Sequence, residues 1–279
     1  MRIQYLGTGA AEGFPAAFCN CIHCSAARKD PEREWRTRSQ ALIDGKLLVD
    51  FPPESYLHAV RYGVDLSAVR ALLVTHSHTD HFYAQEFVNR GYKFASGMTS
   101  PILDIYGDET VREVYEEGTR REIKPEVLSG IRFRVVQPFG HFEADGYEIF
   151  SLPATHTKEE KSLLYCIRRE GKTLLYLNDT GLLREECYAF LAGNGIRADF
   201  VSLDCTFADD PSPHSPRHMG FAENETVRGR LADYGIVHGG TQYCVTHFSH
   251  NSAPFRRRIE EEAKKRGFLA AYDGALFEF

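Results

Sequence analysis

Four side chains that can bind a divalent metal lie within six positions of one another. They are His76, His78, Asp80 and His81, in the pattern HxHxDH. The apolar run 69–74 before them predicts a buried strand, so these ligands belong to a strand end and the loop that follows. On an extended chain His76 and His78 point to the same side, and after the turn Asp80 and His81 can point to a second position. The segment therefore predicts a site for two metals, of the kind that hydrolases use.

Three further candidate ligands each follow an apolar, strand-like run. His156 follows residues 149–155, Asp179 follows residues 173–178, and His247 follows residues 243–246. The alternative is that these are ordinary surface histidines and carboxylates that bind no metal. The repeated position at a strand end favours a shared site.

The HxHxDH motif and the three later residues resemble the metallo-β-lactamase superfamily. The resemblance divides the seven ligands between two metals: His76, His78 and His156 on one, Asp80, His81 and His247 on the other, and Asp179 as the bridge. It also implies that Asp80 takes part in catalysis. Zinc, manganese and iron all suit this mixture of imidazole and carboxylate ligands. Two such ions lower the pKa of a shared water towards neutrality.

A second cluster of candidate ligands lies near the amino terminus. Cys19, Cys21 and Cys24 form a CxCxxC pattern, and His250 is available late in the chain. Three cysteines and one histidine fill all four positions of a tetrahedral zinc site, which would be structural because no position remains for substrate. The alternatives are reduced thiols without metal, or His23 as the fourth ligand.

The order of these motifs narrows the resemblance. Leu-Gly-Thr-Gly at residues 6–9, then CxCxxC and HxHxDH, is similar to the PhnP-type phosphodiesterases, and the similarity spans nearly the whole chain. It implies hydrolysis of cyclic or small phosphodiesters with two metals, often manganese. PqqB, a relative associated with quinone cofactor biosynthesis, generally lacks the full ligand set. A lactone, thioester or sulfate-ester hydrolase and a non-catalytic, PqqB-like binding protein remain the alternatives.

Three residues of the second half resemble the elements with which tRNase Z relatives handle a scissile phosphate. Asp204 and Thr206 form an acid-x-Thr element, and His218 follows. By this resemblance His218 donates a proton to the leaving oxygen or holds a phosphate oxygen, and Asp204 fixes its tautomer by a hydrogen bond. Asp50 matches a position that supports a metal-ligating histidine, with a turn-capping role as the alternative.

The predicted elements resemble an αββα sandwich, a four-layer α/β fold with one domain over residues 1–279 and with the metals at one edge. The predicted strands are residues 2–6, 41–43, 47–50, 71–75, 102–106, 133–137, 148–152, 163–168, 174–177, 200–203 and 243–246. The predicted helices are residues 54–61, 83–95, 109–118 and 253–266.

Composition is that of a globular protein of the cytoplasm. The chain has 279 residues, of which 43% are hydrophobic, enough to bury a large core. We expect no membrane span, because no run approaches roughly 18 apolar residues, and no signal peptide, because the first residues are predicted to enter a strand directly. Seven cysteines, an odd number, fit a reducing compartment. We expect four of them in or near the core: Cys166, Cys187, Cys205 and Cys244.

Charge and length indicate a small substrate. A net charge of −6 provides no broad basic surface for a long nucleic acid. Only residues 157–178 separate His156 from Asp179, which leaves no room for the long arm with which tRNase Z relatives grip tRNA. The loop 211–216 is expected to border the active site. We therefore expect a small phosphodiester as the partner and no membrane partner, and a homodimer is left open.

Overall fold

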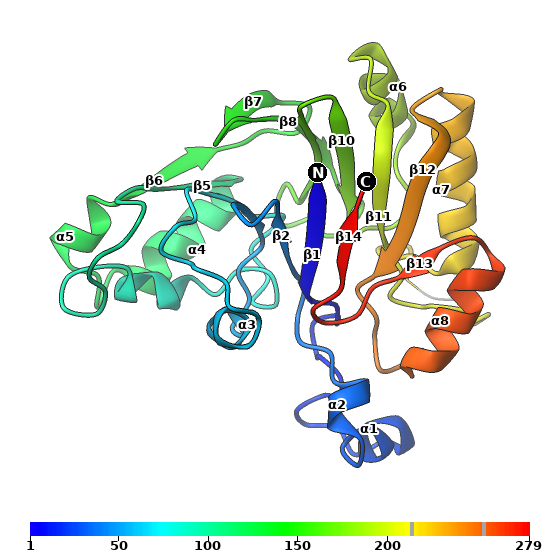
Figure 1. The fold of residues 1–279 in the computed structure, drawn as a ribbon, viewed down its shortest axis with the longest axis horizontal. Helices are drawn as coiled ribbons and strands as arrows, with labels where there is room; N and C mark the ends of the chain where they lie inside the picture. The colour runs from blue at the N-terminus through cyan, green and yellow to red at the C-terminus, as the bar shows by residue number, and fades with distance from the viewer. Residues whose placement is uncertain (213–214, 253–254) are drawn as a thin grey trace.

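Two seven-stranded mixed sheets pack face to face and carry helices on their outer surfaces (Figure 1). The structure is a computed structural model that describes residues 1–212, 215–252 and 255–279. The α/β class and the four-layer αββα arrangement predicted from the sequence are confirmed.

The first sheet has the order β14-β1-β2-β3-β4-β5-β6. Its strands are β1 (Arg2–Gly7), β2 (Gln40–Ile43), β3 (Leu47–Val49), β4 (Ala71–Leu73), β5 (Leu103–Gly107), β6 (Ile131–Val135) and β14 (Leu276–Glu278). The second sheet has the order β13-β12-β11-β10-β9-β8-β7. Its strands are β7 (His141–Ala144), β8 (Tyr147–Pro153), β9 (Leu163–Arg169), β10 (Lys172–Leu177), β11 (Ala198–Asp204), β12 (Val237–Thr246) and β13 (Leu269–Ala270).

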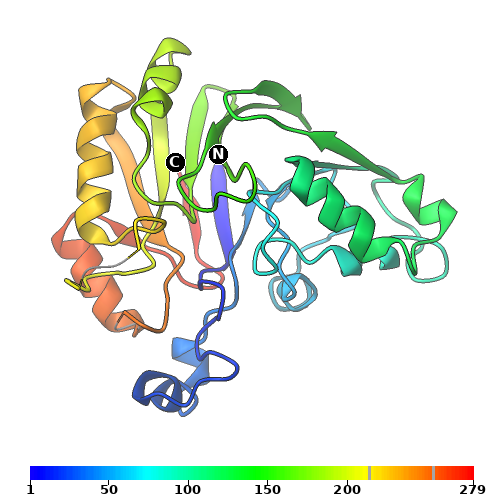
Figure 2. The same cartoon turned by 180° about the vertical axis from the view of Figure 1, so that it is seen from behind.

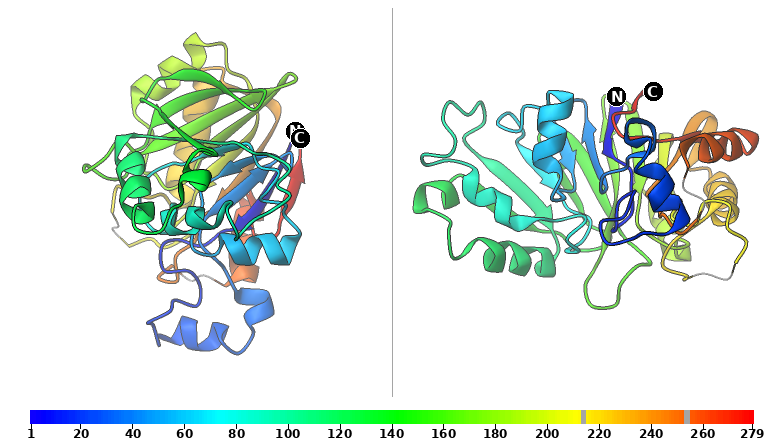
Figure 3. Two further views of the ribbon diagram at one scale, coloured as in Figure 1. Left: turned by 90° about the vertical axis from the view of Figure 1, so that its left-hand side faces the viewer. Right: turned by 90° about the horizontal axis from the view of Figure 1, so that it is seen from below.

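Helices cover both outer faces, and a small helical arm projects from one end of the sandwich (Figures 1 and 2). The first sheet is covered by α3 (Ser55–Tyr62), the 3₁₀ helix η1 (Ala84–Asn89), α4 (Glu109–Thr119) and α5 (Pro125–Leu128). The second sheet is covered by α6 (Glu185–Gly193), α7 (Phe221–Asp233) and α8 (Arg256–Lys265). The arm consists of α1 (Ile22–Ala27) and α2 (Pro31–Glu34), and the left view of Figure 3 shows it extending away from the sheets.

Alternate residues of the central strands build two different cores. In β10, Leu174 and Tyr176 face the other sheet, whereas Leu175 and Leu177 pack against the helices. Because side chains alternate between the two faces of a strand, a strand buried on both faces reads as one continuous apolar run. This is why the apolar runs of the sequence predict these central strands well.

The predicted helix over residues 83–95 is wrong in extent and type. Only Ala84–Asn89 is helical, and it is a 3₁₀ helix. Gly91 then adopts φ +143°, a conformation that ends helical structure and that side-chain-bearing residues rarely adopt. The chain therefore leaves the metal-binding loop as an irregular segment.

Five observed helices lie outside the predicted ones, namely α1, α2, α5, α6 and α7, and two predicted segments lie partly outside the described residues. Helix α7 buries Phe221, Asn224, Val227 and Leu231, a narrow stripe at helical spacing that the sequence does contain. Helix α6 was also missed. The predicted helix 253–266 is observed as Arg256–Lys265, and positions 253–254 lie outside the described residues, as do positions 213–214 of the predicted active-site loop.

The two ends of the chain meet in the first sheet. Strand β14 pairs antiparallel with β1, and the Met1 amino group donates to the Phe279 carbonyl at 3.3 Å. None of the helices in the described residues is both long enough and apolar enough to cross a membrane.

Phe200 tests the packing between the two sheets, because it is fully buried and its ring contacts Phe277 and Phe279. We expect Phe200→Ala to lower the free energy of unfolding by about 3–5 kcal/mol, since it leaves a cavity in a closely packed core. Phe18→Ala is the control, because Phe18 is fully exposed, and its effect should stay within about 0.5 kcal/mol. Urea denaturation measures both. Equal losses in the two variants would contradict the assigned core.

Candidate metal centre

All seven predicted ligands of the dinuclear site meet at one edge of the sandwich. His76 follows β4, His156 follows β8, Asp179 follows β10 and His247 follows β12. Strands β10, β11 and β12 are parallel neighbours, so their carboxyl ends lie at the same edge. The site is thus assembled from strand ends that are far apart in sequence.

The first group of ligands consists of His76, His78, His156 and Asp179, whose ligand atoms lie within 4.8 Å of one another. His78 Nδ1 lies 3.0 Å from His76 Nε2 and 3.2 Å from His156 Nε2. His76 Nε2 is 3.3 Å from Asp179 Oδ2. Three imidazole nitrogens and one carboxylate oxygen therefore surround a single point.

The second group consists of Asp80, His81, His247 and the same Asp179. His81 Nε2 lies 3.2 Å from Asp80 Oδ2 and 3.1 Å from Asp179 Oδ2, and His247 Nε2 lies 3.7 Å from that oxygen. Because Asp179 belongs to both groups and offers two oxygens, it stands where a bridging ligand is required.

Unpaired buried atoms test whether these residues fit metal ions. In the described residues, four buried atoms of the two groups have no hydrogen-bond partner: His81 Nε2, His156 Nδ1, Asp179 Oδ1 and His247 Nε2. Buried polar atoms are normally satisfied, because leaving them unpaired is costly. Divalent cations would satisfy nitrogen and carboxylate atoms gathered in this way, so the donor set fits the metals that the sequence predicts.

Residues outside the ligand groups orient the ligands. His81 Nδ1 donates to Asp50 Oδ2 at 2.7 Å, which directs His81 Nε2 towards Asp80 and Asp179. Asp50 therefore contacts a candidate metal ligand, as the predicted supporting position requires. His247 Nδ1 lies 2.9 Å from Thr206 Oγ1 and 3.3 Å from Asp204 Oδ2. Such contacts fix the ring orientation and the tautomer of a ligand.

Three residues of the site have a strained backbone. Asp50, Asp179 and His247 have φ values of +63°, +57° and +64°. A residue other than glycine in this left-handed region costs about 1–3 kcal/mol and persists only where its surroundings enforce it. The backbone at each of these points is bent so that the carboxylate or the imidazole reaches the cluster.

His218 lies at the accessible side of the cluster. Its Nδ1 is 3.0 Å from Asp179 Oδ1 and 3.3 Å from Asp204 Oδ2, and its side chain is 23% exposed. Burial alone would lower the pKa of His218, but the neighbouring carboxylates of Asp179 and Asp204 outweigh burial and raise it to about 10. Burial opposes ionisation of Asp204, but hydrogen bonds from His218 and His247 prevail and lower its pKa to about 2.

For two of the other imidazoles, burial outweighs the neighbouring carboxylate. It lowers the pKa of His76 well below its ordinary value and lowers that of His156 to about 4. These two rings are therefore neutral at pH 7, and a neutral imidazole is the form that binds a metal.

The amino-terminal cysteines and His250 form a separate cluster in the arm. The ligand atoms of Cys19, Cys21, Cys24 and His250 lie within 4.8 Å of one another. His250 Nδ1 is 3.7 Å from Cys21 Sγ and 3.4 Å from Cys24 Sγ. His23 Nδ1 instead faces the carbonyl of His250 at 3.2 Å, so the geometry favours His250 over His23 as the fourth ligand.

The thiols of this arm have shifted pKa values. A hydrogen bond from the Cys24 backbone N–H, and a further one with His250, lower the pKa of Cys21 to about 6. Burial raises the pKa of Cys24 to about 11. The four other cysteines are buried, as predicted: Cys166, Cys187, Cys205 and Cys244.

Sequence reasoning missed two residues that hold the ligand loops. Glu160 Oε2 accepts from the Ser77 backbone N–H at 2.8 Å, in the middle of the HxHxDH motif. Glu12 Oε1 accepts from the His250 N–H at 3.1 Å. Neither lies in a motif, so only the fold reveals them.

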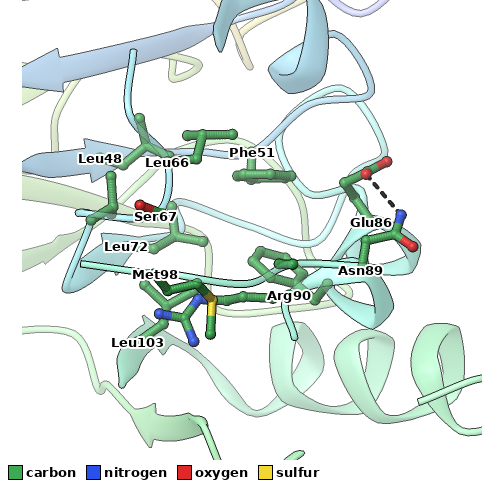
Figure 4. A pocket seen from close by; sticks show the side chains of 13 residues that line it. Leu48, Phe51, Leu66, Ser67, Leu72, Glu86, Asn89, Arg90, Met98 and Leu103 are labelled. Carbon is green, nitrogen blue, oxygen red and sulfur yellow. Dashed lines mark hydrogen bonds between the residues drawn. The ribbon is translucent and has the colours of Figure 1, made fainter. Parts of the chain in front are cut away.

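Two cavities of the described residues differ in character and in their relation to the ligand cluster. The first is apolar and is bordered by side chains such as Leu48, Phe51, Leu72 and Leu103 (Figure 4). None of its lining residues is a candidate ligand. The second, about 510 Å³, is lined by His218 and by residues of the loop that includes Pro211 and Pro216, so it is the one that opens beside the metal cluster.

The fold and the site agree with what comparison with known proteins finds. The model of the family described as beta-lactamase superfamily domain matches residues 48–248. The chain belongs to this family, and the class that the fold and site define is that of the metallo-β-lactamase-fold, metal-dependent hydrolases.

A curated relative matches over part of its length. Coenzyme PQQ synthesis protein B of Methylobacterium radiotolerans is 32% identical over 132 residues. The alignment covers 42% of this chain and 44% of that protein, so less than half of the relative is matched.

Solved structures share the fold over the whole chain. A diphosphatase from the PhnP family has a TM-score of 0.73 at 24% identity, covering 100% of this chain and 97% of its own. Zn²⁺-bound PqqB from Methylobacterium extorquens has a TM-score of 0.75 at 19% identity, covering 100% of both chains. The short form of human tRNase Z has a TM-score of 0.66 at 14% identity, covering 100% of this chain and 99% of its own.

Replacing Cys21 tests the cysteine cluster. We expect Cys21→Ser to release one equivalent of zinc and to lower the melting temperature, because a structural zinc site contributes its binding free energy to folding. Metal analysis and thermal unfolding measure the two effects. Cys187→Ala is the control, since Cys187 is a core thiol, and it should keep its zinc. Unchanged zinc content and melting temperature in Cys21→Ser would rule out the structural site.

Proposed function

We propose that this chain hydrolyses small phosphodiesters at a dinuclear metal centre. The position of His218 carries the proposal. It places a further imidazole at the accessible side of the ligand cluster, 3.3 Å from the carboxylate of Asp204. A histidine whose Nδ1 is held by a carboxylate can use Nε2 to protonate a leaving oxygen, and alkoxide leaving groups of diesters need such a proton.

The roles of the other residues follow from their positions. Bound divalent metals would supply an acidified water and neutralise charge on the phosphate. His76, His78 and His156 would hold one metal, and Asp80, His81 and His247 the other. Asp179 would bridge them. Asp204 would orient both His218 and His247, because its Oδ2 lies 3.3 Å from the Nδ1 of each.

The surroundings of His218 support a small substrate. The cavity of about 510 Å³ is within the range of small-molecule sites. Between His156 and Asp179 the chain forms only the β9–β10 hairpin, where tRNase Z relatives carry a long arm. The net charge of −6 also disfavours long nucleic acids.

The metals and the compartment are proposals as well. Manganese or zinc suits the histidine-carboxylate cluster, and zinc suits the three thiols and His250. Free thiols of this number support a reducing compartment such as the cytoplasm.

A diphosphate linkage is the second candidate substrate, and one comparison favours it. The PhnP-family protein with the same fold is described as a diphosphatase. Phosphodiesters and diphosphates both require attack on phosphorus and protonation of a leaving oxygen, so the same residues would serve either substrate.

Hydrolysis of bis(p-nitrophenyl) phosphate by enzyme of known metal content, with manganese added, tests the proposed activity. We expect turnover of this diester and none of p-nitrophenyl phosphate. Asp179→Ala is the control, because loss of the bridge should abolish turnover while the fold remains. A diphosphate-bridged dinucleotide, cleaved in place of the diester, would favour the second candidate. No turnover of any phosphate by the metal-loaded enzyme would reject the proposal.

His218→Ala separates acid catalysis from phosphate binding. Proton donation typically contributes about 10²–10⁴-fold, so we expect a loss of at least 100-fold for a cyclic ribose phosphate, whose leaving alkoxide needs a proton. The loss should be much smaller for a p-nitrophenyl ester, because that leaving group departs as an anion. Steady-state kinetics on both substrates measure the difference, with exposed His141→Ala as control. Equal losses on the two substrates would assign His218 to phosphate binding.

A further inference from the structure

A chain of hydrogen bonds outside the metal cluster links Asp273 to Asp50. Thr37 Oγ1 lies 2.6 Å from Asp273 Oδ2 and 2.7 Å from His58 Nε2. His58 Nδ1 is 2.6 Å from Gln40 Oε1, and Gln40 Nε2 donates to the Asp50 carbonyl at 3.0 Å. The chain thus connects the turn before β14, the start of β2 and helix α3 to the residue that orients His81.

The orientation of the Gln40 amide shows which nitrogen of His58 carries a proton. Its Nε2 faces the Asp50 carbonyl, which can only accept, and Ser55 Oγ at 3.0 Å. The Ser55 hydroxyl donates its own proton to the Pro52 carbonyl at 2.7 Å. Turning the amide around would place two carbonyl oxygens against each other. Gln40 Oε1 therefore faces His58, and His58 Nδ1 must carry a proton.

The Thr37 hydroxyl requires a second proton on one of its two partners. It carries a single hydrogen, but both Asp273 Oδ2 and His58 Nε2 lie within hydrogen-bond distance of its oxygen. If it donates to Asp273, His58 Nε2 must donate to Thr37, and His58 then carries a proton on both nitrogens. If it donates to His58, Asp273 must be protonated and donate to Thr37. An ionised Asp273 beside a neutral His58 leaves one of the two short contacts without a hydrogen.

We propose that His58 and Asp273 together hold one proton more than an ordinary carboxylate and a neutral imidazole, and that His58 is a positioning residue for the metal centre. Its Nδ1–H holds the Gln40 amide, and Gln40 in turn holds the carbonyl of Asp50. That bond supports the left-handed turn at Asp50, where φ is +63°. From this turn the Asp50 carboxylate reaches His81 Nδ1 at 2.7 Å.

The surroundings favour one location for the extra proton. Burial raises the pKa of Asp273, although hydrogen bonds from Thr37 oppose the rise. Burial, and next the charge of Arg61, lower the pKa of His58 to about 3. Of the two groups, these directions favour Asp273 over His58 as the site of the extra proton. Other charged or titratable side chains near the pair are Arg36, Arg38, Glu54 and Tyr62.

Nuclear magnetic resonance of the zinc-loaded protein near neutral pH tests the extra proton. Nitrogen-15 shifts report which ring nitrogens of His58 are protonated, and the carboxyl carbon-13 shift reports the state of Asp273. We expect a protonated Nδ1, together with either a protonated Nε2 or a protonated Asp273. An ionised Asp273 beside a neutral His58 would overturn the proposal.

Metal affinity tests the positioning role. Loss of an outer-shell partner typically weakens metal binding by about 10–100-fold, so Gln40→Leu should weaken one of the two active-site zinc equivalents at least tenfold and leave the other unchanged. Ser39→Ala is the control, because Ser39 is an equally buried neighbour whose hydroxyl contacts Tyr176 instead of His58 or Asp50. Unchanged affinities for both equivalents in Gln40→Leu would overturn the positioning role.

The positioning role rests on the two-metal site proposed above, but neither measurement requires turnover. A protein without phosphodiesterase activity can still show the extra proton and the selective loss of one zinc. Failure of this proposal is therefore distinguishable from failure of the proposed function.

Discussion

The whole site depends on one carboxylate that is buried where the ends of the strands converge. Asp179 is 3% exposed, and five imidazoles lie within 4 Å of it. They are His76, His81, His156, His218 and His247. A buried charge is tolerated only where opposite charge or hydrogen-bond donors surround it. The fold must therefore bring four separate segments of chain to the end of β10.

The backbone at this edge is held in conformations that it would not adopt alone. Asp50, Asp179 and His247 all have positive φ, and each is tied by side-chain contacts that oppose relaxation. His81 donates to Asp50, and Thr206 and Asp204 contact His247. These contacts offset the backbone strain and hold the ligand atoms close together.

The loop after β12 supplies a candidate ligand to each of the two clusters, so the cysteine cluster also affects the position of the histidine-carboxylate cluster. His247 belongs to the histidine-carboxylate cluster, and His250, three residues later, belongs to the cysteine cluster. The same loop contacts the first strand region, because the Phe248 N–H donates to the Thr8 carbonyl at 2.9 Å. Tying His250 to the arm thus limits the movement of the loop that carries His247.

The sequence by itself determined the types of the candidate ligands, their order along the chain and the strands that precede them. A strand that is buried on both faces is a continuous apolar run, so the residue at which it ends can be recognised in the sequence. That was enough to predict the fold class and to group the seven candidate ligands that the structure brings together. It did not determine the 3₁₀ helix at Ala84–Asn89, helices α6 and α7, or the pairing of β14 with β1. Only the tertiary structure decided the support by Glu160 and Glu12 and the contacts that link His58 to Asp273 through Thr37. These features depend on distances between residues far apart in the chain, and the local spacing of residues in the sequence does not specify such distances.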